Sequence, residues 1–369
     1  MRASSGAYFA GLDHLRGLAA FLVFTWHFLH STNGVPVAFG QRPAVFPLAI
    51  FDEGHCGVAL FMALSGYLFA KLLDGKEVHY GWFLWNRALR LCPLLFVVLG
   101  YRTLRVAMAG GDVAGFARSL LEGLVMPTLP AGAWSITVEA HFYIVLPLIL
   151  LLFRRSMGWA IAILIAALGL RGLIYLETGQ VFELAYLTLA GRIDQFVLGM
   201  VFFRYREWFA GKHLLLLVGF LGYSGCYYYV DGLRVFYETA CCTEADPIWI
   251  VLPTADGLFF AALIAYYDAL SLPASGVSGL LARIGEYSYS IYLLHFFLVF
   301  KIAEFTNDHL VPITNFYVAL AASLAAFLLI VPLAGLSYHL VEKPALRFRR
   351  GYIRTRAGLP AIGAVQAVS

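Results

Sequence analysis

The chain has 369 residues, of which 61% are hydrophobic and 13% are charged, whereas about a quarter of the residues in a soluble domain are charged. A core surrounded by water cannot hide that much apolar surface. The composition therefore excludes an ordinary soluble protein and predicts one embedded in a lipid bilayer. The net charge of +4 is modest, and we expect membrane lipid but no nucleic acid among its partners.

Apolar runs long enough to cross a hydrocarbon core of about 30 Å recur along the whole chain. Helices are expected because lipid cannot satisfy the polar groups of the backbone. Ten runs fall at roughly 11–30, 56–73, 91–109, 135–153, 157–176, 190–206, 212–230, 248–268, 286–303 and 315–337. The sequence therefore predicts an all-α bundle of about ten transmembrane helices, with a membrane domain over residues 1–345 and a basic cytoplasmic tail over residues 346–369.

Basic residues are unevenly divided between the two sides of this predicted bundle. If both termini are cytoplasmic, the inner segments hold about twice as many Lys and Arg residues as the outer segments, as the positive-inside rule requires. The sequence therefore favours cytoplasmic termini.

Ionisable side chains occur inside the first predicted helix, where lipid makes them costly and marks them as functional candidates. Arg16 and His27 are eleven residues apart, which is about three helical turns, so both face the same way about 16.5 Å apart along the axis. A histidine can accept and return a proton near neutral pH, so His27 is a candidate catalytic base. The alternative is that Arg16 extends to the interface and that His27 only bonds to a neighbouring helix.

Arg87 and Arg90 stand just before the third apolar run, three residues apart and on one helical face. Paired guanidinium groups bind phosphate well because their planar N–H groups match its oxygens. This pair is therefore a candidate site for a ligand that carries phosphate groups. The alternative is ordinary positive charge on the cytoplasmic side.

A polar segment opens the fourth apolar run with Trp134, Ser135 and Glu139. A carboxylate at this position can orient and charge-stabilise a histidine base from another helix. The alternative is that Glu139 is an interfacial residue in contact with water.

A single polar stripe marks the ninth apolar run, because Ser288, Tyr292 and His295 recur at positions i, i+4 and i+7. Such a stripe faces other helices and not lipid. It either lines a site or provides hydrogen bonds that hold helices together.

Taken together, these segments resemble the membrane-bound acyltransferase-3 family, which includes O-antigen and exopolysaccharide acetylases and nodulation-factor acetyltransferases. The similarity runs from Leu12 to Pro344 and depends on the order and number of motifs that are each weak alone. These motifs are Leu12–Gly17, Arg16 with His27, Phe61–Leu68, Arg87 with Arg90 before Pro93, Trp134–Tyr143, Arg192–Phe196 with Gly199, Ser288–His295 and Glu342–Pro344.

The resemblance implies transfer of an acyl group, usually acetyl, from acyl-CoA to a sugar hydroxyl in a bacterial inner membrane. It implies that Arg16 and His27 are essential, with Glu139 near them, and that the arginine pair serves the donor. Acyl-CoA is then a co-substrate, the acceptor is a carbohydrate, and we expect neither a permanently bound cofactor nor a metal. Candidate substrate-binding residues are Asp13, Trp134, Ser135, Tyr292 and His295.

Several points differ from the family or stay open. Many relatives carry a fused extracytoplasmic domain, and this chain resembles the shorter members. His14 stands where many relatives have a small or neutral residue. Two other functions remain, a transporter of a sugar or small solute and a membrane sensor without turnover. The acceptor sugar, the acyl chain, the order of transfer, the oligomeric state and a bridge from Cys56 to Cys241 or Cys242 are also open.

Overall fold

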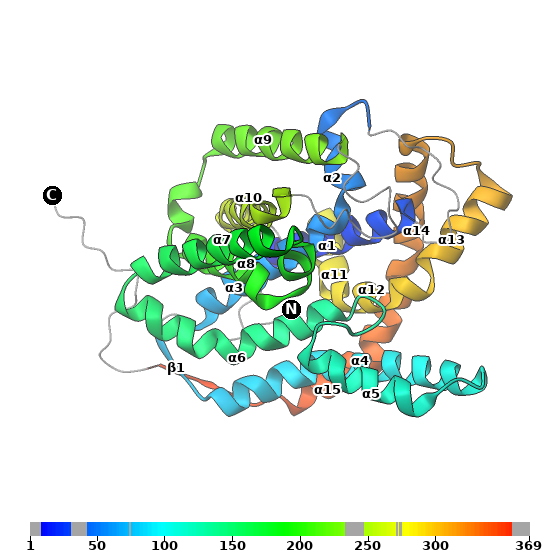
Figure 1. Cartoon of the computed structure of the whole chain (residues 1–369), viewed down its shortest axis with the longest axis horizontal. Coiled ribbons are helices and arrows are strands. Elements are labelled where there is room, and N and C mark those ends of the chain that lie inside the picture. The colour runs from blue at the N-terminus through cyan, green and yellow to red at the C-terminus, as the bar shows by residue number, and fades with distance from the viewer. Residues whose placement is uncertain are drawn as a thin grey trace.

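The computed structural model describes residues 9–30, 43–73, 75–232, 247–270, 272 and 275–355. This part of the chain is mostly helical, as the hydropathy predicts (Figure 1). Cys241 and Cys242 lie outside the described residues, so their pairing with Cys56 stays a prediction.

Long helices occur at the positions of the apolar runs. They are α1 (Ala10–Leu29), α3 (Gly57–Leu73), α4 (Tyr80–Met108), α6 (Trp134–Arg155), α7 (Gly158–Thr178), α8 (Leu189–Arg204), α9 (His213–Gly232), α10 (Leu252–Asp268) and α14 (Phe316–Ser337). The ninth run is broken into α12 (Ser288–Leu294), the 3-10 turn η6 (His295–Phe297) and α13 (Val299–Phe305).

Short elements connect these helices. The helical ones are α2 (Ala49–Asp52), α5 (Val113–Val125), α11 (Gly276–Glu286) and α15 (Lys343–Ala345). The 3-10 and π turns are η1 (Phe46–Leu48), η2 (Gly54–Cys56), η3 (Glu183–Leu187), η4 (Arg206–Phe209), η5 (Pro247–Ile250), η7 (Thr306–Leu310), η8 (Tyr338–Glu342) and η9 (Leu346–Phe348).

Five helices within the described ranges are long and apolar enough to cross a membrane, and a bent pair could supply a sixth. The five are Gly54–Leu73, Tyr80–Met108, Trp134–Arg155, Gly158–Thr178 and Phe316–Phe348, and the pair, bent by 59°, is Ser288–Phe297 with Val299–Leu310. The number ten therefore stays a prediction. Helix α8, for example, is short and carries the buried charges of Arg192 and Asp194.

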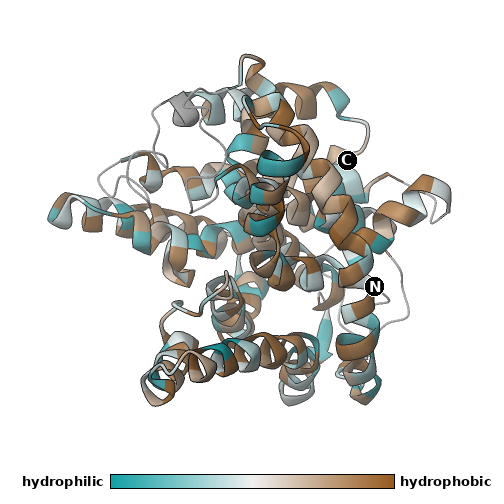
Figure 2. Cartoon of the chain, turned by 90° about the vertical axis from the view of Figure 1, so that its right-hand side faces the viewer, coloured by the Kyte–Doolittle hydropathy of each residue, from teal (hydrophilic) through white to brown (hydrophobic). Residues whose placement is uncertain are grey.

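The outward faces of the long helices are apolar. Helix α7 exposes 61% of Ile161, 65% of Ile165 and 81% of Leu176, and Figure 2 shows hydrophobic residues along the outer helices. Water would penalise such faces, whereas lipid tails solvate them. The described structure is thus that of a membrane protein.

Helix α4 starts earlier than the sequence predicts, which moves Arg87 and Arg90 inside the helix and not before it. The His79 side chain caps this start, because its Nδ1 accepts a hydrogen bond from the Trp82 N–H at 3.3 Å. Polar residues in the first turns lower the local hydropathy, so the apolar run marks only the later part of α4. Helices α5 and α11 were not predicted because neither is part of a long apolar run.

Two glycines allow close packing between α3 and α8. A Cβ atom on Gly66 would lie 2.0 Å from the Phe196 carbonyl oxygen, and one on Gly199 would lie 2.1 Å from that of Ala63. Backbone atoms in contact leave no room for a methyl group. The small residues in the segment Phe61–Leu68 thus have a structural function.

Part of the segment predicted as a tail is folded onto the body. Strand β2 (Ile353–Thr355) pairs antiparallel with β1 (Lys76–Val78), which adds a two-stranded ribbon to the helical fold. Asn86 of α4 donates to the Arg350 carbonyl at 2.7 Å and accepts from the Arg350 N–H at 3.0 Å. The chain after α14 therefore returns to the start of α4.

We expect Gly66→Ala to destabilise the protein by about 1–3 kcal/mol, because the new methyl group must push the α8 backbone away from α3. The measurement is unfolding of the purified protein in detergent. Gly169→Ala is the matched control, since nothing lies within 4 Å of its Cβ position on α7, and it should be neutral or stabilising. Equal stability of the two variants would contradict the packing described here.

Candidate functional site

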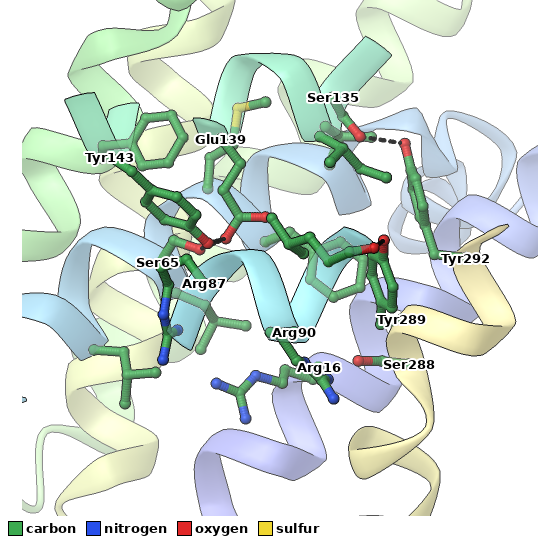
Figure 3. Close-up of a pocket in the computed structure, with 18 of the residues that line it drawn as sticks. Arg16, Ser65, Arg87, Arg90, Ser135, Glu139, Tyr143, Ser288, Tyr289 and Tyr292 are labelled. Carbon is green, nitrogen blue, oxygen red and sulfur yellow. Dashed lines mark hydrogen bonds between the residues drawn. The ribbon is translucent and has the colours of Figure 1, made fainter. Parts of the chain in front are cut away.

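A cavity of about 120 Å³ lies between α1, α3, α4, α6, α8 and α12. Three arginines and one carboxylate line it, namely Arg16, Arg87, Arg90 and Glu139, and Figure 3 shows their side chains. Its other polar lining residues are Ser65, Ser135, Tyr143, Ser288, Tyr289 and Tyr292. The structure thus gathers predicted site residues from four distant parts of the sequence.

Arg16 on α1 is paired within its own helix. Its guanidinium donates to the carboxylate of Asp13, which is 1% exposed. The pair lies within one helix, and it neutralises a charge that would be costly in an apolar bundle. Asp13, a predicted substrate-binding residue, thus acts directly on Arg16.

The two arginines of α4 have different surroundings. Arg90 forms an ion pair with Glu342 at 2.9 Å, and the fully buried Glu342 also accepts a hydrogen bond from Ser290. Arg87 lies over the rings of Phe69 and Phe83, at 5.4 and 5.8 Å from their centroids, and its Nε has no hydrogen-bond partner. The charge of Arg90 is therefore balanced by a carboxylate, whereas Arg87 retains an unused N–H donor.

Glu139 is held by hydroxyl groups. Its Oε1 accepts hydrogen bonds from Ser65 at 2.9 Å and from Tyr143 at 2.5 Å. We expected Glu139 to orient His27, but its hydrogen bonds go to α3 and to its own helix. Its charge instead faces the cavity that the three arginines line.

Ser135 and Tyr292 close one end of the cavity. The Ser135 hydroxyl lies 2.8 Å from that of Tyr292, which donates to the Gly132 carbonyl at 3.0 Å. Trp134 turns away, with its ring 5.6 Å from the Arg192 guanidinium and 5.0 Å from the Tyr186 ring. Ser135 and Tyr292 thus belong to the cavity, whereas Trp134 is not among its described lining residues.

His27 pairs with a second histidine. The Nε2 of His295 lies 3.3 Å from the Nδ1 of His27, which also lies 2.9 Å from the Val23 carbonyl oxygen. The Nδ1 of His295 donates to the Tyr292 carbonyl at 2.6 Å, so for a neutral ring its Nε2 is an acceptor. Assigned from these partners, His27 carries its proton on Nδ1 and keeps a lone pair on Nε2. The polar stripe that runs from α12 into η6 therefore supplies His295, the residue that orients His27.

The cavity and the histidine pair adjoin each other. The ring of Tyr292, which lines the cavity, lies 5.8 Å from the ring of His295. His27 itself is flanked by Phe296 at 4.5 Å and Trp26 at 4.6 Å between ring centroids. The site thus has a cationic part and a neutral imidazole part, joined at Tyr292.

Other polar motifs have structural functions. Arg171 donates to Asp194 at 2.8 Å and to the Ile250 carbonyl at 2.8 Å, which fixes α7 to α8 and η5. His14 lies 2.7 Å from the Ser278 carbonyl oxygen and therefore links α1 to α11.

The sequence reasoning missed Tyr143 and Glu342 as site residues. Both are part of motifs that carry the family resemblance, but neither spacing nor hydropathy indicates which helix they contact.

Removing the carboxylate of Glu342 should be costly because it leaves the Arg90 cation without its partner. We expect Glu342→Gln to destabilise the protein by about 3 kcal/mol. The ion pair of Arg206 with the exposed Glu207 provides the control, and Glu207→Gln should cost less than about 1 kcal/mol. Adding Arg90→Met to Glu342→Gln should recover stability in detergent unfolding, and strictly additive losses would contradict this pairing.

Residues 9–335 match a family model described as an acyltransferase domain. Over 368 residues the chain is 27% identical to the acyltransferase MdmB of Streptomyces mycarofaciens, covering 91% of each chain. It is 27% identical over 335 residues to the exopolysaccharide production protein ExoZ of Rhizobium meliloti, covering 84% of this chain and 94% of ExoZ. It is 23% identical over 340 residues to nodulation protein 10 of Rhizobium leguminosarum bv. viciae, covering 81% of this chain and 84% of that protein. No solved structure matches the chain significantly.

Proposed function

We propose, from the premise that this chain belongs to the acyltransferase domain family and is an O-acyltransferase, that its donor is acyl-CoA and its acceptor a carbohydrate. The transferred group is acetyl in the simplest case, and the acceptor is a hydroxyl of a cell-surface or exported glycan. The observation that carries the proposal is one bundle holding an arginine-lined cavity beside an imidazole with a free nitrogen. We further propose about ten spans in a bacterial inner membrane with both termini cytoplasmic.

The donor assignment is supported by the charge of the cavity. Arg16, Arg87 and Arg90 face one space, and Glu139 is the carboxylate among the residues that line it. A polyphosphate needs guanidinium groups to replace the water it loses, whereas a neutral sugar does not. In the proposed orientation these arginines also lie toward the cytoplasm, where CoA is found.

The acceptor assignment is supported by the named relatives and by the chemistry of His27. Two relatives are called a nodulation protein and an exopolysaccharide production protein. A sugar hydroxyl is a weak nucleophile at neutral pH and needs a base at the moment of attack. The Nε2 of His27 carries a lone pair when Nδ1 is protonated, so it suits this step.

The reaction balances with one base. The hydroxyl oxygen attacks the thioester carbonyl as its proton passes to Nε2 of His27. The new C–O bond forms, the C–S bond breaks, and the departing CoA sulfur takes the proton back from the imidazolium. His295 positions the base through the Nδ1 of His27.

An acyl-histidine relay is the alternative order of events. In that case Nε2 of His27 attacks the thioester first and later passes the acyl group to the sugar. Rapid quenching with radiolabelled acetyl-CoA in the absence of acceptor separates the two orders. Label retained by the wild type and lost in a His27 variant indicates the relay.

We expect His27→Ala to lower kcat about 10²- to 10⁴-fold, since the variant keeps the cavity but loses the base. The assay is acetyl transfer from acetyl-CoA to glycan by purified protein. His309→Gln is the control, because His309 is exposed near the end of η7, and it should keep full activity. A folded His27→Ala protein with wild-type turnover would refute the assignment.

Mass spectrometry of surface polysaccharide, with and without the gene, should show a shift of one acyl group per modified sugar. Expression of His27→Ala in the deleted strain should not restore the shift. Sealed vesicles provide the counter-test: solute uptake without consumption of acetyl-CoA would contradict the transferase and favour a transporter.

A further inference from the structure

The segment after α14 brings another arginine to the start of α4. The Trp85 indole donates to the Phe348 carbonyl at 3.1 Å, and Asn86 forms two hydrogen bonds with the backbone of Arg350. Arg349 lies between these two anchored residues, whereas Trp85 and Asn86 directly precede Arg87. The backbone therefore fixes Arg349 beside the helical turn that carries Arg87.

Arg349 is half-buried, and one whole edge of its guanidinium has no hydrogen-bond partner. Its Nε and Nη2 are both buried and unpaired, and so is the Nε of Arg87. The N–H bonds of Nε and Nη2 run parallel along the side of the guanidinium, which is the edge that grips two oxygens of one anion. Buried cations are normally paired, so these unused donors point to an anion.

The neighbouring arginines increase the unbalanced positive charge around Arg349. Burial, followed by repulsion from Arg87 and Arg90, lowers the pKa of Arg349 to about 10, which leaves it charged at neutral pH. Glu342 is committed to Arg90 and Ser290. Within the described ranges Arg87 and Arg349 form no ion pair, and their guanidinium groups are near enough to repel each other.

We propose that Arg349 and Arg87 together bind a phosphate group of the acyl donor, at the α4 side of the cavity. This inference rests on the proposed function and adds a residue from the far end of the sequence to the donor site. A phosphate monoester matches the site because two guanidinium groups balance its two negative charges. Their planar N–H groups also match the spacing of its oxygens. Arg90, already paired, acts with Arg87 on the cavity side.

The decisive comparison uses two donors, acetyl-CoA and acetyl-pantetheine, which lacks the nucleotide phosphates. Arg349→Gln should raise KM for acetyl-CoA about 10- to 100-fold, the usual effect of losing hydrogen bonds to a charged group. It should leave KM for acetyl-pantetheine unchanged. Arg349→Lys should be intermediate, because an ammonium cannot form the two parallel bonds.

Arg347→Gln is the matched control on the same segment, since Arg347 is exposed two residues away. It should keep the wild-type KM for both donors. Equal KM values for acetyl-CoA in Arg349→Gln and Arg347→Gln would overturn the inference. An equal loss with both donors would also overturn it, because a purely structural function of Arg349 would affect them alike.

A second readout does not depend on turnover. Without ligand, Arg349→Gln should melt at a higher temperature than the wild type, since it removes a cation whose buried N–H groups have no partner. Adenosine 3′,5′-bisphosphate should raise the melting temperature of the wild type and of Arg347→Gln but not that of Arg349→Gln. Stabilisation by phosphatidylglycerol nanodiscs alone, lost in Arg349→Gln, would identify a lipid headgroup and overturn the donor assignment.

The two levels of proposal fail separately. A wild type that binds the bisphosphate through Arg349 but never transfers acetyl would contradict the proposed function and leave the phosphate site intact. A wild type that transfers acetyl with no effect of Arg349→Gln would contradict the phosphate site and leave the function intact.

Discussion

The ion pair between Arg90 and Glu342 joins the first half of α4 to the turn that follows α14. Each partner would be costly alone in an apolar bundle, so the pair holds two distant parts of the chain in one arrangement. Because Glu342 is used in this way, it neutralises Arg90 and leaves Arg87 and Arg349 without a carboxylate. The same interaction thus positions α4 and leaves positive charge at the edge of the cavity.

The positions of the long helices could be predicted from the sequence because apolar runs of bilayer length have few alternatives. The helical period also placed Arg16 and His27 on one side of α1, and the stripe of α12 lies along that side, with Ser288 in the cavity beside Arg16 and His295 beside His27. Local periodicity is sufficient for these features, since each lies on one continuous stretch of helical chain.

Contacts between helices could not be predicted in this way. The sequence named Glu139 as the residue that orients His27 and His295 only as a substrate-binding candidate, and the packing of α1 against η6 is what brings His295 to His27. The start of α4 depends on the His79 cap, and the return of the chain to α4 depends on Asn86. These are single polar contacts across the fold, and they leave no periodic signal in the sequence.

The separation of charge and imidazole follows from the solvent that surrounds the bundle. Phosphate groups cannot be drawn deep among apolar helices without a large desolvation cost, so their guanidinium partners belong at the face of the bundle. A base for a hydroxyl must instead be neutral before the reaction, and burial favours a neutral imidazole. A donor with a long uncharged arm between its phosphates and its acyl group meets both requirements. Of the candidate activities, the acyl transfer from a CoA thioester that we propose is therefore the one that accounts for both parts of the site.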